Sequence, residues 1–126
     1  NNYSVVPLTG SSSILLALVA SGFNGQNFAF NGYLPIDKTQ RMKRLNKLES
    51  RLHSEGQTQL FMEAPYRNMA MLESILAACS SNISLSIAAN IGGASANIRT
   101  KKISEWKKEP LPNIHKIPTV FSLGQS

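Results

Sequence analysis

The segment Thr58-Gln59-Leu60-Phe61-Met62-Glu63-Ala64-Pro65 decides the fold class of this chain. Residues Thr58 to Glu63 favour a strand, and Ala64-Pro65 ends it because proline cannot continue a regular ladder. A helix is predicted directly afterwards, from about Asn68 to Cys79. Its predicted inward residues are Met69, Leu72, Leu76 and Ala77. A strand, a short turn and a helix in this order are the repeating unit of α/β proteins.

A long amphipathic helix is predicted upstream, from Asp37 to Ser54. A different face of this helix carries Lys43, Lys47 and Arg51, which recur every four residues. Its apolar residues recur at spacings of three and four and are Met42, Leu45, Leu48 and Leu52. One face of the helix is therefore expected to pack, and another to be cationic.

Two further strands and a helix are predicted before this point. Tyr3 to Leu8 is expected to be a strand, followed by a turn and a helix from Ile14 to Ser21 that stops at Gly22. Phe28-Ala29-Phe30 is expected to be a second strand, closed by Asn31-Gly32-Tyr33-Leu34-Pro35, where Asn-Gly and proline both break regular structure.

Downstream, the pattern changes to a hairpin. Ile83 to Ala89 is a predicted strand, Gly92-Gly93 turns the chain, and Asn97 to Lys101 is the predicted returning strand. A short helix from Ile103 to Lys108 and a last strand from Lys116 to Leu123 complete the pattern. The whole chain, residues 1–126, is thus expected to be one α/β domain. Its mixed sheet should have about five strands flanked by helices, with parallel first strands and an antiparallel hairpin.

Composition limits the classes of function. The 126 residues include 42% hydrophobic and 16% charged residues, and a net charge of +6 favours polyanionic partners such as RNA or anionic lipid. A single cysteine and two distant histidines argue against a disulfide or a metal centre and fit a reducing compartment, the cytoplasm. The longest apolar run, Ile14 to Ala20, is too short to span a bilayer. Because Asn1 to Ser4 contain no initiator methionine, the segment is expected to come from a longer protein.

Candidate chemistry is sparse, and alternatives stay open. The serines at 11 to 13 lack the Gly-x-Ser-x-Gly pattern of a nucleophile elbow, so their turn is expected either to hold an anionic group or simply to cap a helix. Glu63 and Arg67 are predicted to lie at the carboxyl end of a strand, where open α/β sheets bind ligands, or else to form a structural ion pair. The cationic helix face could bind phosphates or be merely solvated, and no aromatic residue interleaves it.

Three stretches together resemble one known family. The stretch Val5-Val6-Pro7-Leu8-Thr9-Gly10-Ser11-Ser12-Ser13, with Ala20-Ser21-Gly22 one helix later, resembles "V-P-G-P-S-A … A-S-G" of the tetrapyrrole methylases. Phe30-Asn31-Gly32-Tyr33-Leu34-Pro35 is similar to the "F-x-G-F-L-P" of their ribosomal-RNA ribose methyltransferase branch. Phe61-Met62-Glu63-Ala64-Pro65-Tyr66-Arg67 is similar to the "F-Y-E-A-P-H-R" of that branch.

This resemblance implies the C-terminal domain of a two-domain, S-adenosylmethionine-dependent methyltransferase, commonly a homodimer. The cofactor would lie in the cleft between the two domains, so the 126 residues alone are expected to be inactive. Gly32 and Pro35 would shape the cleft wall, and Lys43, Lys47, Arg51 and Arg67 would face RNA. The residues that the resemblance places against the cofactor are Ser12, Glu63, Ala64, Pro65, Ile117, Pro118 and Thr119.

The sequence departs from that branch after the fourth family strand. Where the branch has "A-R-E-L-T-K", this chain has Ala88-Ala89-Asn90-Ile91-Gly92-Gly93. No residue is therefore assigned a catalytic role. The ribose of ribosomal RNA is the expected acceptor. A tetrapyrrole C-methyltransferase and a basic, non-catalytic RNA-binding domain are the alternatives.

Overall fold

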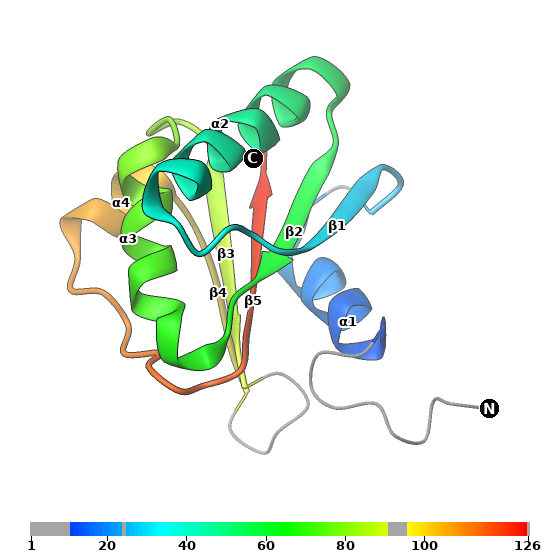
Figure 1. Ribbon diagram of the computed structural model, residues 1–126. Coiled ribbons are helices and arrows are strands. Elements are labelled where there is room, and N and C mark those ends of the chain that lie inside the picture. The colour runs from blue at the N-terminus through cyan, green and yellow to red at the C-terminus, as the bar shows by residue number, and fades with distance from the viewer. Residues whose placement is uncertain (1–10, 24, 91–95, 126) are drawn as a thin grey trace.

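Alternating strands and helices form one five-stranded sheet with helices on both faces (Figure 1). This computed structural model describes residues 11–23, 25–90 and 96–125, and only the backbone of residues 11–13. The strands are β1 (Phe28–Tyr33), β2 (Thr58–Met62), β3 (Ser84–Ala89), β4 (Asn97–Lys102) and β5 (Thr119–Gly124). The helices are α1 (Ser11–Ser21), α2 (Lys38–Glu55), α3 (Asn68–Ala78) and α4 (Ile103–Lys108), with a 3₁₀ turn at Pro65–Arg67.

The strand order is β1-β2-β5-β3-β4. Strands β1 and β2 are parallel, whereas β5 runs antiparallel to both of its neighbours, β2 and β3. Strands β3 and β4 form an antiparallel hairpin. The predicted α/β class and the mixed five-stranded sheet are confirmed, and β1 and β2, two of the predicted first strands, are parallel as expected. The predicted strand from Tyr3 to Leu8 lies outside the described residues.

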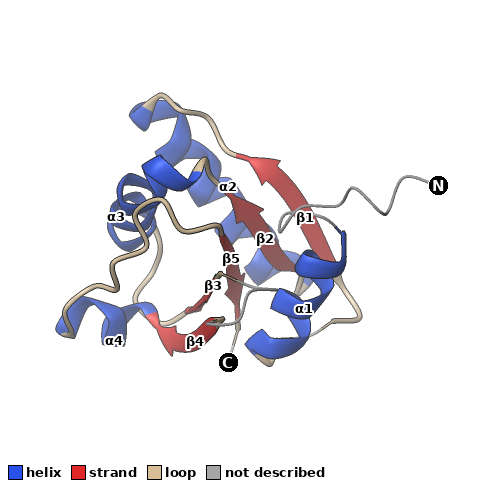
Figure 2. Cartoon of the chain, turned by 90° about the horizontal axis from the view of Figure 1, so that it is seen from below, coloured by secondary structure: helices blue, strands red, loops and turns tan. Residues whose placement is uncertain are grey.

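This topology gives the sheet two different edges. Because β1, β2 and β3 run in one direction, their last residues share an edge with the first residues of β4 and β5. We call it the C-terminal edge and the opposite one the N-terminal edge. The C-terminal edge is at the bottom of Figure 1 and faces the viewer in Figure 2, which also shows α1 separated from α2 and α3 by the sheet.

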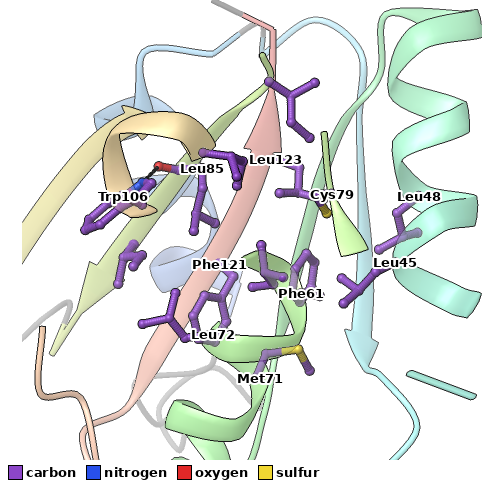
Figure 3. Close-up of a cluster of buried hydrophobic side chains, with 14 of the residues drawn as sticks. Leu45, Leu48, Phe61, Met71, Leu72, Cys79, Leu85, Trp106, Phe121 and Leu123 are labelled. Carbon is purple, nitrogen blue, oxygen red and sulfur yellow. Dashed lines mark hydrogen bonds between the residues drawn. The ribbon is translucent and has the colours of Figure 1, made fainter. Parts of the chain in front are cut away.

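The face under α2, α3 and α4 holds the larger core (Figure 3). The rings of Phe61 and Phe121 stack with centroids 5.7 Å apart. Trp106 is 1% exposed, and its Nε1 donates a hydrogen bond of 2.9 Å to the carbonyl of Leu85. Burial of such large apolar side chains is the main stabilising contribution of this face.

The opposite face has a smaller core, and α1 is the one described helix that covers it. Apolar residues of α1 pack on the sheet, but its outer residues Leu15, Leu16 and Val19 are more than half exposed. The members of this second core are Ile14, Ala17, Leu18, Leu60, Ala88 and Val120. The helix is apolar on both sides, so periodicity alone could not orient it.

Three details of the prediction are wrong. Asn31-Gly32 does not close β1, because Gly32 adopts φ 66° and a bulge between Phe30 and Tyr33 lets the strand continue. The last strand begins at Thr119 and not at Lys116, since Lys116 has left-handed φ 63° and Pro118 lacks an N–H for the ladder.

The inward face of α3 is also rotated relative to the prediction. Ala77 is exposed, and Met71 and Ile75 are buried instead. The helix begins with the buried Asn68, and spacings of three and four from that residue select this face. On α2, Leu45, Leu48 and Leu52 are buried as predicted, whereas Met42 is only half-buried.

Candidate functional site

Two loops that are distant in sequence meet at the C-terminal edge. One follows β2 and contains Glu63, Ala64 and Pro65; the other precedes β5 and contains Ile117 and Pro118. The backbone N–H of Lys116 donates to the carbonyl of Pro65 at 2.9 Å. The N–H of Asn90, at the end of β3, donates to the carbonyl of Pro118 at 2.7 Å. The structure therefore brings together two of the three segments of the predicted cofactor set, those around Glu63 and around Ile117.

Asn68 fixes this junction and was missed by sequence reasoning. Its side chain is fully buried, and its Nδ2 donates to the carbonyls of Ile114 (3.0 Å) and Ile117 (2.6 Å) and lies 3.3 Å from Oγ1 of Thr119. The hydroxyl of Thr119 in turn donates to the carbonyl of Ile117 at 2.7 Å. The sequence feature that could have revealed Asn68 is a polar residue on the inward face of an apolar helix, because a buried amide is normally hydrogen-bonded.

Glu63 is 2% exposed and forms an ion pair with Arg67, which is the structural one of the two alternatives stated above. Its Oε1 accepts a hydrogen bond from the N–H of Ala64 at 2.7 Å and lies 3.3 Å from Nε of Arg67. The guanidinium of Arg67 also lies over the ring of Tyr66, 4.6 Å from its centroid, and Nη1 donates to the Tyr66 hydroxyl. Arg67 is thus engaged in fixing the turn.

The accessible surface of the junction is apolar. Ala64, Pro65, Ile117 and Pro118 are half-buried, and we call these four residues the apolar wall. Glu63 and Thr119 are buried behind it. Within the described residues, Oε2 of Glu63 and Oδ1 of Asn68 are buried and have no hydrogen-bond partner. An apolar wall with a few convergent polar atoms is the usual lining of a site for a small organic molecule.

The same edge carries backbone strain. Asn90 (φ 54°) and Lys116 (φ 63°) are the two non-glycine residues in the described ranges with left-handed backbone. Residues with a Cβ adopt this conformation rarely, and such strain concentrates at functional sites. Both residues flank the apolar wall through the backbone hydrogen bonds described above.

The remaining predicted site residues are more scattered. Ser12 lies in the first turn of α1, and its side chain is outside the described part. Gly32 is within β1, and Pro35 follows that strand at the C-terminal edge. Ala89 and Asn90 end β3, whereas Gly92 and Gly93 lie outside the described residues.

The predicted RNA-contacting residues of α2 lie on the surface of that helix. Lys43 and Lys47 are exposed and Arg51 is half-buried on the outer side of the helix. Arg41 is buried instead: its Nε donates to Oγ of Ser74 at 2.9 Å and its Nη1 to the carbonyl of Ile36 at 2.7 Å. Arg41 therefore joins α2 to α3 and to the loop after β1.

The single cysteine does not offer a nucleophile. Burial, with a smaller contribution from the charge of Glu49, raises the pKa of the Cys79 thiol to about 12. A thiol, unlike a thiolate, is a poor nucleophile.

The described residues contain no group of three or more His, Cys, Asp or Glu side chains that could hold a metal ion. None of the described helices is both long and apolar enough to cross a membrane.

No protein-family model matches the chain. It is similar to ribosomal RNA small subunit methyltransferase I of Buchnera aphidicola from Schizaphis graminum, with 32% identity over 115 residues. That match covers 86% of this chain and 38% of the relative. The enzyme of the same name from Bacillus subtilis is 43% identical over 63 residues, covering 50% of this chain and 20% of the relative.

Two solved structures share the fold. The methyltransferase CobJ superposes with a TM-score of 0.56 at 16% identity, covering 90% of this chain and 47% of that one. The cobalt precorrin-4 methyltransferase CbiF gives a TM-score of 0.55 at 10% identity, covering 89% of this chain and 48% of that one. In each comparison the chain spans less than half the length of its match.

Proposed function

We propose that this chain, which belongs to the tetrapyrrole methylase family by its fold and by its sequence similarity to the ribosomal RNA small subunit methyltransferases I, forms one wall of an S-adenosylmethionine site. The methyl acceptor of the whole enzyme is ribosomal RNA, at a ribose hydroxyl. Both parts of the proposal draw support from the resemblance of the site motifs and from the names of the relatives.

The meeting of two loops at the C-terminal edge carries the proposal. Ligands of open α/β sheets lie outside the carboxyl ends of the strands. The apolar wall lies at such an edge, where the backbone of Lys116 is bonded to Pro65 and that of Asn90 to Pro118. Ala64-Pro65 and Ile117-Pro118 come from opposite sides of the junction, so the wall is complete only where the two loops meet.

The residues present fit the cofactor chemically. Flat aromatic rings bind well against apolar side chains that keep water away, which Ala64, Pro65, Ile117 and Pro118 provide. Oε2 of Glu63 and Oδ1 of Asn68 are acceptors without a partner, but both are buried, so the surface that these loops offer to the cofactor is mainly apolar. When bound, S-adenosylmethionine supplies an electrophilic methyl group, and the task of this chain is to hold and orient it.

The proposal includes a second domain. The match spans 38% of the Buchnera relative, which leaves room for a further domain that supplies the facing wall of the cleft. The intact protein is accordingly proposed to be a cytoplasmic homodimer, and the 126 residues alone to be inactive.

The test is methyl transfer by the intact protein. Isotope-labelled S-adenosylmethionine is incubated with small ribosomal subunits and, separately, with a porphyrin precursor. We expect label in the RNA, at a linkage that resists alkali because the ribose hydroxyl is blocked. Label in the precursor alone would replace the acceptor with a tetrapyrrole, and no label in either substrate would contradict an active methyltransferase.

A further inference from the structure

A second cationic region lies away from the α2 face. Residues 97–116 contain six of the 13 Lys and Arg residues and two of the seven acidic ones, a net charge of +4. Helix α2, from Lys38 to Glu55, also contains six basic and two acidic residues and has the same net charge. Charge alone therefore does not say which region meets a polyanion.

A pocket distinguishes the two regions. A cavity of about 480 Å³ opens between β3, β4, α4 and the loop that leads to β5. We call it the β4–α4 pocket. Arg99 and Lys116 bring cations to its lining and Asn113 brings an amide, while Ile87, Trp106 and Ile114 are apolar and buried. In Figure 1 the orange loop after α4 runs along the outside of the domain down to the C-terminal edge.

The cations of the pocket are available to a ligand. Arg99 and Lys116 are exposed and form no ion pair among the described residues. Lys101, by contrast, is paired with Glu109, and its Nζ lies 4.7 Å from the centroid of the Trp106 ring. The guanidinium of Arg99 lies 5.8 Å from the same centroid, so it stands beside the apolar lining of the pocket. A planar guanidinium can stack on a base and also donate two hydrogen bonds to a phosphate.

The β4–α4 pocket is continuous with the proposed cofactor site. Ile117 and Pro118 line the pocket and also belong to the apolar wall. Lys116 is held at this boundary by its left-handed backbone and by its hydrogen bond to Pro65. A chain of nucleotides that lay along the pocket would therefore arrive beside the methyl donor.

We propose that the β4–α4 pocket binds a nucleotide of single-stranded RNA, with its base against Arg99 and the apolar lining and its phosphate near Lys116. The choice of RNA as the ligand rests on the proposed function. The site itself is new, because it is separate from the cationic face of α2. The outer side of α2 has equal charge, but the helix contains no aromatic residue and none of its residues lines the β4–α4 pocket. Stacking and phosphate contacts together are the usual way of binding single strands.

The test compares two matched double variants of the intact protein without cofactor. R99Q/K116Q removes the two cations of the pocket, and K43Q/K47Q removes two cations of α2. Binding of a labelled single-stranded RNA is followed by fluorescence anisotropy over a range of salt concentrations. We expect R99Q/K116Q to weaken binding about tenfold and to reduce the slope of log K against log salt by about 0.7, the value for the one phosphate contact of Lys116 that is lost. K43Q/K47Q should change affinity less than about threefold.

Further measurements keep the result interpretable. Arg99→Lys retains the charge but loses the planar fork, so it should bind RNA less tightly than the wild type with an unchanged salt slope. Circular dichroism confirms that each variant is folded. Equal weakening by both double variants, or a larger effect of K43Q/K47Q, would overturn the proposed site.

Two other outcomes would also overturn it. If R99Q/K116Q lost binding to vesicles of anionic lipid but not to RNA, the pocket would serve a membrane surface. If the variant bound RNA normally but lost S-adenosylhomocysteine, the pocket would hold the cofactor, and the proposed function would stand without this inference. Conversely, failure of the intact protein to transfer methyl groups would leave a measured RNA site in place.

Discussion

The two edges of the sheet differ in how completely their buried polar groups are hydrogen-bonded. At the N-terminal edge, the N–H of Thr58 donates to the carbonyl of Asn27 at 3.0 Å, and the N–H of Ile103 to that of Ile83 at 2.9 Å. Among the described residues, five buried side-chain atoms lack a hydrogen-bond partner. Three lie at the C-terminal edge: Oε2 of Glu63, Oδ1 of Asn68, and Nε of Arg67, which is nevertheless ion-paired with Oε1 of Glu63 at 3.3 Å. The other two belong to serines within the sheet, and none lies at the N-terminal edge.

This difference assigns stability mainly to one edge of the sheet and binding mainly to the other. Each unpaired buried polar atom costs stability, on the order of 1–3 kcal/mol, unless a ligand or water satisfies it. Left-handed backbone at Asn90 and Lys116 adds to that cost at the same edge. We infer that the N-terminal edge holds the domain together, and that the C-terminal edge gives up some stability for a surface that binds.

We expect the largest effect on stability at Asn68, which holds together the two loops of the binding edge. Asn68→Leu removes the donor for the carbonyls of Ile114 and Ile117 and leaves them buried. We expect a loss of about 3 kcal/mol in the free energy of unfolding. Urea denaturation of the intact protein measures this loss. The matched control is Asn82→Leu, in an exposed turn, which should change stability by less than about 0.5 kcal/mol. A loss no larger than that of the control would mean that Asn68 does not fix the junction.

A smaller effect is expected at the N-terminal edge, and it depends on pH. Burial of Glu49 would raise its pKa, but hydrogen bonds from Ser80 and His53 outweigh burial and hold the pKa below the ordinary value of 4.5. The N–H of Ser80 donates to Oε1 at 2.9 Å, and Nε2 of His53 lies 2.9 Å from Oε2. Because the pKa is lowered in the folded state, the stabilisation is full above 4.5 and is lost as the pH falls through the lowered value.

Glu49→Gln should therefore cost about 1 kcal/mol at neutral pH, and its difference from the wild type should shrink in acid. Urea denaturation at both pH values measures this, with the exposed Glu73→Gln as the control. RNA and cofactor affinity should not change. If Glu49→Gln lost ligand binding while its stability was unchanged, the claim that the N-terminal edge serves stability and not binding would be contradicted.

Local patterns predicted the elements better than the site. The short helix at Ile103–Lys108 and the hairpin of β3 and β4 follow from alternation and spacing, which depend on near neighbours. The bulge in β1 and the late start of β5 depend on Gly32 and Lys116 adopting left-handed backbone, which no periodicity encodes.

In the candidate site, too, local motifs were predictable, whereas features made by distant segments were not. The motif around Glu63-Ala64-Pro65 indicated one half of the junction, and the resemblance added Ile117-Pro118. The hydrogen bonds of Asn68 and the pocket beside Arg99 arise only when distant segments pack together, so they could not be read from spacing. Equal charges on α2 and on residues 97–116 likewise hid the difference between a solvated helix face and a lined pocket.

The most direct test of the account is calorimetric titration of S-adenosylhomocysteine into the intact protein and two matched variants. Ala64→Glu places a carboxylate in the apolar wall, whereas Ala77→Glu adds the same charge on the exposed side of α3. We expect the wild type and Ala77→Glu to bind alike, and Ala64→Glu to bind at least about tenfold more weakly, because the new charge would lose its water against the ligand. Equal affinity of all three proteins would contradict the claim that the C-terminal edge forms one wall of the cofactor site.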